Sequence, residues 1–307
     1  HIEGTRLDTG VLWLGNGEID NHRVNNVGGT VLSTGGTITN TEVALSENAS
    51  ILVARAPLSC TQCLVSGMGR LDIESGGTLL LDQSVIGDLV NDPNTLGVNN
   101  EGHFEVVSTA ELKGNAVLTN TGTVEVAFDK FLELVDYRQF GGSINIDGGV
   151  KPNGEFDVSG GRVTGSGVVL GSVRNRNGVL LADNLGINGH YTQERTGTLL
   201  LDFSQTSNPL QPTVSAEIEG LLSIVLTQDV LDAITEGASF DFLQYPGGLT
   251  GEFERVNIEM EDGSEVEAWD AVVIYGATVA TIHWTEGEPT DLGELPLFQD
   301  SFEWGPE

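Results

Sequence analysis

Short runs in which apolar and polar residues alternate recur along most of this chain. Residues 123–126 read Thr-Val-Glu-Val and residues 143–146 read Ser-Ile-Asn-Ile. Successive side chains of a β-strand point to opposite faces, so such a run buries its aliphatic residues and leaves its polar residues in water. The pattern predicts many short strands and no long helix in this part of the chain.

Glycines set the period of these runs. Six glycines follow one another at intervals of 20, 20, 19, 17 and 19 residues: Gly102, Gly122, Gly142, Gly161, Gly178 and Gly197. A second column lies seven or eight residues upstream of four of them: Gly114, Gly154, Gly171 and Gly189. Glycine suits tight corners because it adopts positive φ without a Cβ penalty. Self-similarity at about 20 residues predicts a solenoid built from β-strands.

The predicted fold class is therefore all-β, a parallel β-helix of about 20 residues per coil with a β-rich C-terminal cap. About ten coils are expected between residues 10 and 205, forming a rod on the order of 50 Å long. Leucine-rich repeats have a similar period, but their regularly placed leucines are missing. The predicted core includes Val124, Val126, Ile144, Ile146, Val163, Leu199 and Leu201.

The pattern changes after residue 205, which divides the chain into residues 1–205 (coils), 206–284 (cap) and 285–307 (tail). Longer strands are expected at 223–227, 239–245, 253–258, 271–275 and 279–284, with one short helix between Asp229 as its cap and Gly237 as its stop. Because an open solenoid end exposes unpaired backbone and apolar side chains, we expect this region to close it.

The charge of the chain limits its partners. It has 45 acidic and 13 basic residues among 307, a formal net charge of −32. Nucleic acids and anionic membrane surfaces repel such a protein, and no apolar stretch is long enough to span a membrane. We interpret the charge as a solvated acidic surface. The alternative use is Ca²⁺ binding between neighbouring chains or coils; no other cofactor is indicated. The first residues contain no signal peptide, which suggests a processed chain, a fragment or an expression remnant.

Two cysteines, Cys60 and Cys63, form a single C-x-x-C. A redox pair of this spacing would need a βαβ unit, and a zinc site would need further ligands, whereas the five histidines are scattered. The remaining interpretation is a small disulfide on a loop that bulges from a coil, which places the protein outside the reducing cytoplasm. A glycosylation sequon begins at Asn48.

Several segments resemble autotransporter-type passenger β-helices and secreted bacterial β-solenoid repeat proteins. The stretch GGRVTGSG (160–167) with GSVRN (171–175) is similar to their "GG-x-V-x-G-x-G … G-x-V-x-N" motif, and GHYTQ (189–193) with GTL (197–199) to their "G-x-Y-T-Q … G-T-L" motif. The resemblance covers about residues 140–284, although Leu181-Ala182-Asp183 replaces the usual Pro-Gly. It implies a cell-surface or secreted protein and no particular activity.

An enzyme is the first alternative, because parallel β-helices also carry polysaccharide lyases and hydrolases. These need clustered carboxylates and a basic residue. The candidate carboxylate pairs are Glu125 with Asp129 and Asp147 with Asp157, and the candidate bases are Arg138, Lys151 and Arg162. A glycan- or Ca²⁺-binding surface module is the second alternative. We favour a non-enzymatic extracellular structural or adhesive protein.

The tail beyond residue 285 combines acidic residues with large apolar ones: Leu295, Leu297, Phe298, Phe302 and Trp304. Charge and proline would ordinarily leave such a segment unfolded, yet its apolar residues suit docking. The tail packs either on its own solenoid or on another subunit as an added strand. We predict docking on another subunit, which joins copies head to tail into a filament.

Overall fold

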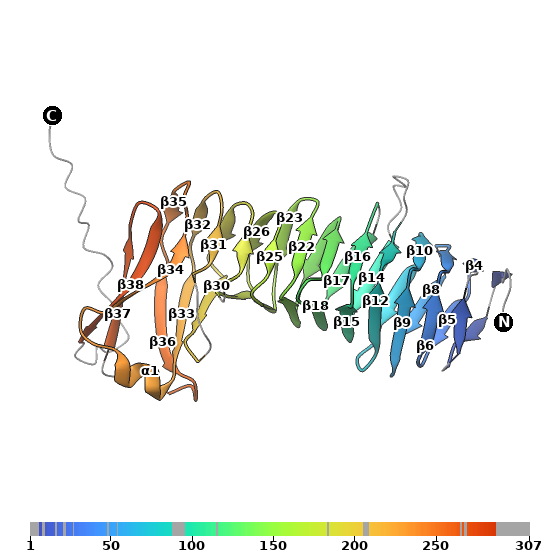
Figure 1. Cartoon of the computed structure of the whole chain (residues 1–307), viewed down its shortest axis with the longest axis horizontal. Helices are drawn as coiled ribbons and strands as arrows, with labels where there is room; N and C mark the ends of the chain where they lie inside the picture. Colours follow the sequence, from blue (N-terminus) through green and yellow to red (C-terminus); the bar gives the residue numbers. More distant parts are fainter. Residues whose placement is uncertain are drawn as a thin grey trace.

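The computed structural model describes residues 6–7, 10–15, 17–20, 23–26, 28–47, 49–53, 55–87, 96–114, 116–182, 184–204, 209–264, 266 and 269–286. Three parallel sheets run along a rod, and the chain passes through them in the order A, B, C in each coil (Figure 1). The prediction of a parallel β-helix with about 20 residues per coil is thereby confirmed.

Each sheet takes every third strand of the chain. Sheet A contains β1 (Arg6–Leu7), β4 (Arg23–Asn26), β7 (Glu42–Leu45), β10 (Leu64–Gly67), β13 (Ser84–Ile86), β16 (Thr109–Leu112), β19 (Phe131–Leu134), β22 (Gly149–Pro152), β25 (Val168–Val169), β28 (Gly186–Ile187) and β31 (Gln211–Pro212). Sheet B contains β2 (Val11–Trp13), β5 (Thr30–Ser33), β8 (Ser50–Val53), β11 (Arg70–Ile73), β14 (Leu96–Asn100), β17 (Ala116–Asn120), β20 (Asp136–Gln139), β23 (Glu155–Val158), β26 (Ser172–Asn175), β29 (Tyr191–Gln193), β32 (Ala216–Ile218) and β35 (Leu249–Gly251). Sheet C contains β3 (Glu18–Asp20), β6 (Gly36–Thr39), β9 (Pro57–Thr61), β12 (Thr78–Asp82), β15 (His103–Val106), β18 (Thr123–Val126), β21 (Ser143–Ile146), β24 (Arg162–Thr164), β27 (Val179–Leu181), β30 (Thr198–Asp202), β33 (Leu221–Leu226) and β36 (Arg255–Met260).

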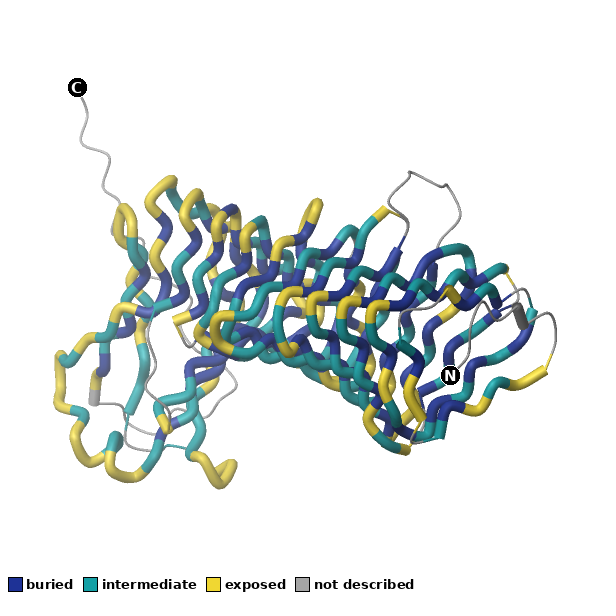
Figure 2. Tube along the Cα trace, turned by 45° about the vertical axis from the view of Figure 1, so that its right-hand side comes forward, coloured by how far each residue is buried: buried dark blue, intermediate teal, exposed yellow. Residues whose placement is uncertain are grey.

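The core consists of columns of aliphatic and aromatic side chains in exact register between coils. On sheet C, for example, Val124 lies opposite Phe104 on one side and Ile144 on the other. All seven core residues predicted from the sequence are buried, and buried and half-buried positions alternate along the strands in Figure 2. Burial of these columns is the main stabilising contribution to the fold.

The glycine period marks where two coils approach most closely. A Cβ on Gly142, which has a φ of +58°, would lie 1.8 Å from the carbonyl oxygen of Gly122 in the preceding coil. A Cβ on Gly161 (φ +71°) would meet two backbone oxygens at 2.5 Å. Glycine is required at these corners both for its conformation and for its lack of a side chain.

Strands of all three sheets continue beyond residue 205, up to Met260 at the end of β36. The region 206–284 that the sequence assigns to a cap thus contains both the last coils and a closing antiparallel sheet. This sheet D has the order β34 (Ser239–Gln244), β38 (Val279–Glu286), β37 (Trp269–Tyr275). It continues sheet A, because Leu210 next to β31 pairs in parallel with Leu243 of β34.

Side chains of the last coils and of sheet D fill the end of the core: Phe242, Tyr245, Phe253, Ile282 and Trp284 are buried. The single helix in the described chain, α1 (Gln228–Ala233), begins earlier than predicted. Its cap is Thr227, whose hydroxyl oxygen accepts a hydrogen bond from the Val230 amide at 3.3 Å, and Asp229 lies in the first turn. No helix of the described residues is long and apolar enough to cross a membrane.

Candidate functional site

The outer face of sheet B carries opposite charges on successive coils. Arg138 of β20 lies opposite Asp157 of β23, and Asp157 lies opposite Arg174 of β26. Neighbouring strands are about 4.8 Å apart, so side chains in one such column reach the next coil. The register therefore places each of these charges beside a charge of opposite sign.

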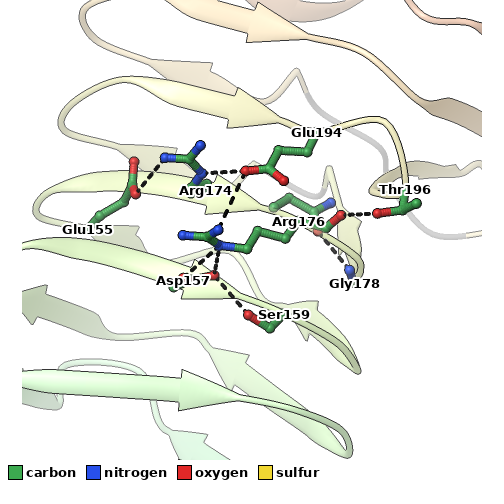
Figure 3. Close-up of polar contacts among 9 residues, drawn as sticks. Glu155, Asp157, Ser159, Arg174, Arg176, Gly178, Glu194 and Thr196 are labelled. Carbon is green, nitrogen blue, oxygen red and sulfur yellow. Dashed lines mark hydrogen bonds and ion pairs between the residues drawn. The ribbon is translucent and has the colours of Figure 1, made fainter.

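Ion pairs join three consecutive coils at this position (Figure 3). The Arg176 Nε atom donates to both carboxylate oxygens of Asp157, at 3.0 and 2.8 Å. Arg174 Nε donates to Glu194 Oε1 at 2.6 Å, and its Nη1 atom lies 3.5 Å from Glu155 Oε2. The hydrogen bond to Glu194 raises the pKa of Arg174 further above its ordinary value. These contacts connect each coil to the next along the rod.

A hollow of about 420 Å³ lies beside the ion pairs. Its lining consists of Tyr137, Arg138, Phe140, Glu155, Asp157, Ser159 and Arg176. The Phe140 side chain stands 58% exposed at its edge. An exposed ring beside guanidinium and carboxylate groups can hold a hydroxylated ligand such as a sugar by stacking and hydrogen bonds. Asp157 itself is occupied, because Ser159 Oγ also donates to its Oδ1 atom at 3.1 Å.

Two buried tyrosines support this face from inside. The ring of Tyr137 stacks on that of Phe156 with centroids 4.7 Å apart, and its hydroxyl donates to Gln139 Oε1. The Tyr191 hydroxyl donates to Gln193 Oε1 at 2.7 Å. Burial raises the pKa of both tyrosines well above the ordinary value, because a phenolate would be desolvated. Both hydroxyls therefore act as structural donors.

Buried amides recur along one column of sheet B, at its corner with sheet C: Asn100, Asn120, Gln139, Asn175 and Gln193, with Val158 between Gln139 and Asn175. Each of these side-chain amides donates to a backbone carbonyl of the next coil: Asn100 to Thr123 at 2.7 Å, Asn120 to Ser143 at 3.2 Å, Gln139 to Arg162 at 3.0 Å, Asn175 to Thr198 at 3.1 Å and Gln193 to Leu221 at 3.1 Å. Asn175 and Gln193 are the last residues of the G-x-V-x-N and Y-T-Q motifs. The motifs thus supply backbone hydrogen bonding. Sequence reasoning missed this column, although Asn100, Asn120 and Gln139, and again Asn175 and Gln193, follow one another at intervals of 18 to 20 residues.

The predicted carboxylate pairs do not form a common site. Asp147 follows β21, where Asn145 Nδ2 donates to its Oδ2 atom at 2.8 Å, whereas Asp157 lies on sheet B. Glu125 faces outward from sheet C, 3.8 Å from His103 Nε2, and Asp129 occupies the following turn. Within the described residues, no three His, Cys, Asp or Glu side chains are grouped to hold a metal ion.

The three predicted bases lie on three different faces of the rod. Arg138 lines the hollow on sheet B, Lys151 pairs with Glu133 at 3.1 Å on sheet A, and Arg162 is exposed on sheet C. Only Arg138 and Asp157 among the predicted candidates come together. Sequence reasoning missed Arg174 and Arg176 as charged partners, although Arg174 belongs to the G-x-V-x-N motif.

Cys60 and Cys63 lie at a tight corner between sheets C and A. Both are buried, and the structure joins them in a disulfide with their Cα atoms 5.8 Å apart. The predicted position on a protruding loop is wrong, because Gln62 between them adopts a φ of +52° and turns both side chains inward. The predicted sequon residue Asn48 lies outside the described residues, as do the tail residues Leu295, Leu297, Phe298, Phe302 and Trp304.

A larger hollow of about 720 Å³ lies where sheet A meets the cap. Neutral polar side chains from both parts line it, among them Asn188, Thr213 and Gln244, together with Asp241. Two of these groups already pair with a neighbour: Thr213 Oγ1 donates to Asn188 Oδ1 at 3.2 Å, and Asp241 accepts from Thr281 at 2.7 Å. This hollow contains none of the residues that the sequence singled out.

No model of a known protein family matches the chain, and no curated protein matches it. One solved structure aligns with 86% of this chain and 100% of its own, at 14% identity and a TM-score of 0.34. It is the TibC-catalysed hyper-glycosylated fragment 55–350 of TibA.

Proposed function

We propose that this chain is a non-enzymatic, structural or adhesive β-solenoid of the extracellular space or cell surface. The observation that carries the proposal is the dispersal of the charged candidates. Lys151 lies on sheet A, Asp147 follows a strand of sheet C and Asp157 lies on sheet B, whereas a lyase or hydrolase needs its carboxylates and base at one site. Such dispersal suits a rod that keeps its shape and displays its faces.

The alternative function is that of a polysaccharide-active enzyme, and an activity assay distinguishes it from a structural or adhesive role. Purified protein is incubated with acidic and neutral polysaccharides, and the release of new chain ends is measured over time. We expect none. Release of ends that is lost in an Arg138→Ala variant, while an Arg162→Ala variant retains it, would overturn the proposal, because Arg138 lines the hollow on sheet B and Arg162 does not.

Glycan binding is a second candidate function, and the exposed ring of Phe140 beside Arg138 favours it. We expect retention of the protein on an immobilised glycan to fall in a Phe140→Ala variant. Phe128→Ala is the matched control, because Phe128 is 75% exposed but lies outside this hollow. Equal retention of both variants would contradict a glycan site at this position.

The disulfide supports the extracellular placement, because such bonds persist in oxidising compartments. Under denaturing conditions, protein isolated without reductant should gain no mass on alkylation, and should gain two alkyl groups once it has been reduced. Two thiols that react before reduction would contradict both the bridge and the placement. Denaturation is needed because Cys60 and Cys63 are buried.

Self-association is the second part of the proposal. We propose that the apolar residues between Leu295 and Trp304 dock on another copy and so join rods into a filament. The test removes residues 287–307, which keeps all of β38. Assembly of the truncated chain equal to that of the full chain, seen by electron microscopy, would exclude the tail as the joint.

A further inference from the structure

Strand β37 is an outer strand of sheet D at the C-terminal end of the rod (Figure 1). It pairs with β38 over seven residues, and no strand of the described chain pairs with its other edge. An open edge of this kind presents a row of backbone N–H and C=O groups that can accept a further strand.

The composition of β37 leaves this edge unprotected. Natural edges are usually blunted by charges, proline, bulges or short length, whereas β37 is long for this protein and contains no proline. Its single charge, Asp270, lies near one end, and residues 271–285 include no Asp, Glu, Lys or Arg. Val272 and Ile274 point outward and remain 49% and 46% exposed.

We propose that β37 is a homotypic interface, at which the β37 strand of a second copy adds in antiparallel orientation. This inference goes beyond the self-association part of the proposed function, because the contact joins two caps without the tail and gives a closed dimer rather than a head-to-tail filament. The two copies would be related by a two-fold axis, as in most homodimers. Their sheets D would merge into one six-stranded sheet, with the two rods joined at their C-terminal caps.

The sequence of β37 is complementary to itself in this arrangement. If Val273 lies opposite its own counterpart, each Val272 faces an Ile274 and each Asp270 faces a Gly276. Apolar β-branched pairs of this kind stabilise neighbouring strands, and no carboxylates meet. A second copy is thus a partner that supplies an uncharged, β-branched edge of matching length.

Charge outside the strand opposes this contact and makes its strength depend on the salt concentration. Residues 206–307 contain 21 of the 45 acidic residues and one of the 13 basic ones, Arg255. Two such ends repel each other, and the repulsion is screened over about 10 Å in 0.1 M salt but over about 3 Å in 1 M salt. The dimer should therefore tighten as salt rises, whereas an interface of ion pairs would weaken.

The test is sedimentation equilibrium of the full chain and of a chain lacking residues 287–307, each at about 0.1 M and 1 M salt. We expect a dimer from both chains, with a lower dissociation constant at high salt. Ile274→Lys should raise that constant at least about tenfold, because each Lys would replace an apolar pair with Val272 by a charged side chain that has to lose water. Val107→Lys is the control: it adds the same charge at a side chain that is 41% exposed, away from the cap.

Hydrogen exchange gives a second readout, since the β37 amides should be protected in the dimer and not in Ile274→Lys. A monomer in both salts, or an Ile274→Lys chain that dimerises like the wild type, would overturn the inference. Loss of assembly on removing residues 287–307 would also overturn it and favour tail docking. If the truncated chain dimerises and the full chain does not, the inference is also overturned, because the tail would then cover β37.

Discussion

The middle coils and the C-terminal cap bury similar side chains but treat their polar groups differently. In the middle coils, each strand has a neighbour on both edges, and charges and amides in one column meet their partners one coil away. In the cap, β34, β38 and β37 run antiparallel, β37 lacks a second neighbour among the described strands, and acidic residues greatly outnumber basic ones. In a regular repeat, the register between coils gives each polar group a partner in the next coil. The last coil has no next coil, so its polar groups and strand edges need other partners.

The largest expected effect is the burial of a charge in either region. Val126→Asp and Ile282→Asp each place a carboxylate at a position that is fully buried, in β18 and β38 respectively. Each should cost about 3–5 kcal/mol, because the charge finds no partner there. Thr123→Asp, at an exposed position of β18, is the control; it removes only the surface hydrogen bonds of the Thr123 hydroxyl with His103 and the Gly102 carbonyl, and should change stability by about 1 kcal/mol or less.

The two variants should differ in where they unfold, which hydrogen exchange can locate. Val126→Asp interrupts the stack, so the coils on both sides of β18 should exchange faster. Ile282→Asp opens the end, so faster exchange should begin at β36 and decline towards the N-terminus. If both variants unfold the whole chain in one step, the rod is a single cooperative unit and the contrast between coils and cap does not extend to stability.

The loss of one buried amide should have the next largest effect. Gln193 donates to the carbonyls of Glu219 and Leu221 at 2.8 and 3.1 Å and accepts from Tyr191. Gln193→Leu leaves these groups buried without partners and should cost about 1–3 kcal/mol. In the cap, Tyr275→Phe removes one bond, from the Phe253 amide at 3.0 Å, and should cost about 1 kcal/mol.

Denaturant midpoints of the two variants measure this difference. Thr192→Val serves as the control, because Thr192 faces outward between Tyr191 and Gln193. A larger loss for Tyr275→Phe than for Gln193→Leu would show that the cap depends on single hydrogen bonds more than the coils depend on their amide column.

Periodicity explains what the sequence reveals about this fold and what it hides. The glycine intervals and the alternation at Val124 and Val126 predict the coils, because the same physical constraint recurs in each coil. The coils after residue 205 fall within the predicted cap because a polar segment with two prolines, Pro209 and Pro212, is followed by longer strands. In the structure, the corner glycines Gly197 and Gly220 are 23 residues apart. That interval and the prolines around residue 210 break the period, although the sheets continue.

The charged hollow was only partly predictable. Arg138 and Asp157 were candidates by type, but their proximity follows from the register between β20 and β23, which depends on corner lengths. The amide column is visible in part as a spacing, but Val158 interrupts it and Asn also favours turns, so the burial of its members could not be inferred. The open edge of β37 is a property of the sheet order and has no local signal in the sequence.

The four tyrosines are divided between the two regions: Tyr137 and Tyr191 lie in the coils, and Tyr245 and Tyr275 lie in the cap. Burial raises the pKa of each, that of Tyr245 to about 12. A raised folded pKa means that the unfolded chain loses its phenolic proton first. Their contribution to stability is therefore complete below pH of about 10 and declines as the pH rises above it.

Alkaline titration followed by phenolate absorbance should show no ionisation in the folded protein near pH 10. Ionisation should begin with Tyr245, in the cap, so a Tyr245→Phe variant should lose the earliest part of the titration. Phenolate that appears near pH 10 in the folded protein would mean that at least one of these rings is more accessible than the structure indicates.

The smallest effect expected is that of the surface ion pairs, and here the two regions should differ in sign. Asp157→Asn removes the carboxylate that pairs with Arg176 and should cost at most about 1 kcal/mol, since both side chains are partly exposed. Glu259→Gln, in β36, removes one of many acidic charges from a region whose only basic residue is Arg255, and should stabilise slightly by relieving repulsion.

Both effects should shrink in high salt, because screening weakens attraction and repulsion alike. Thermal unfolding of the two variants at low and high salt measures both signs. If Glu259→Gln destabilises at low salt, the acidic excess of the last coils and the cap is held by local contacts, and the long-range repulsion expected there is too weak to matter.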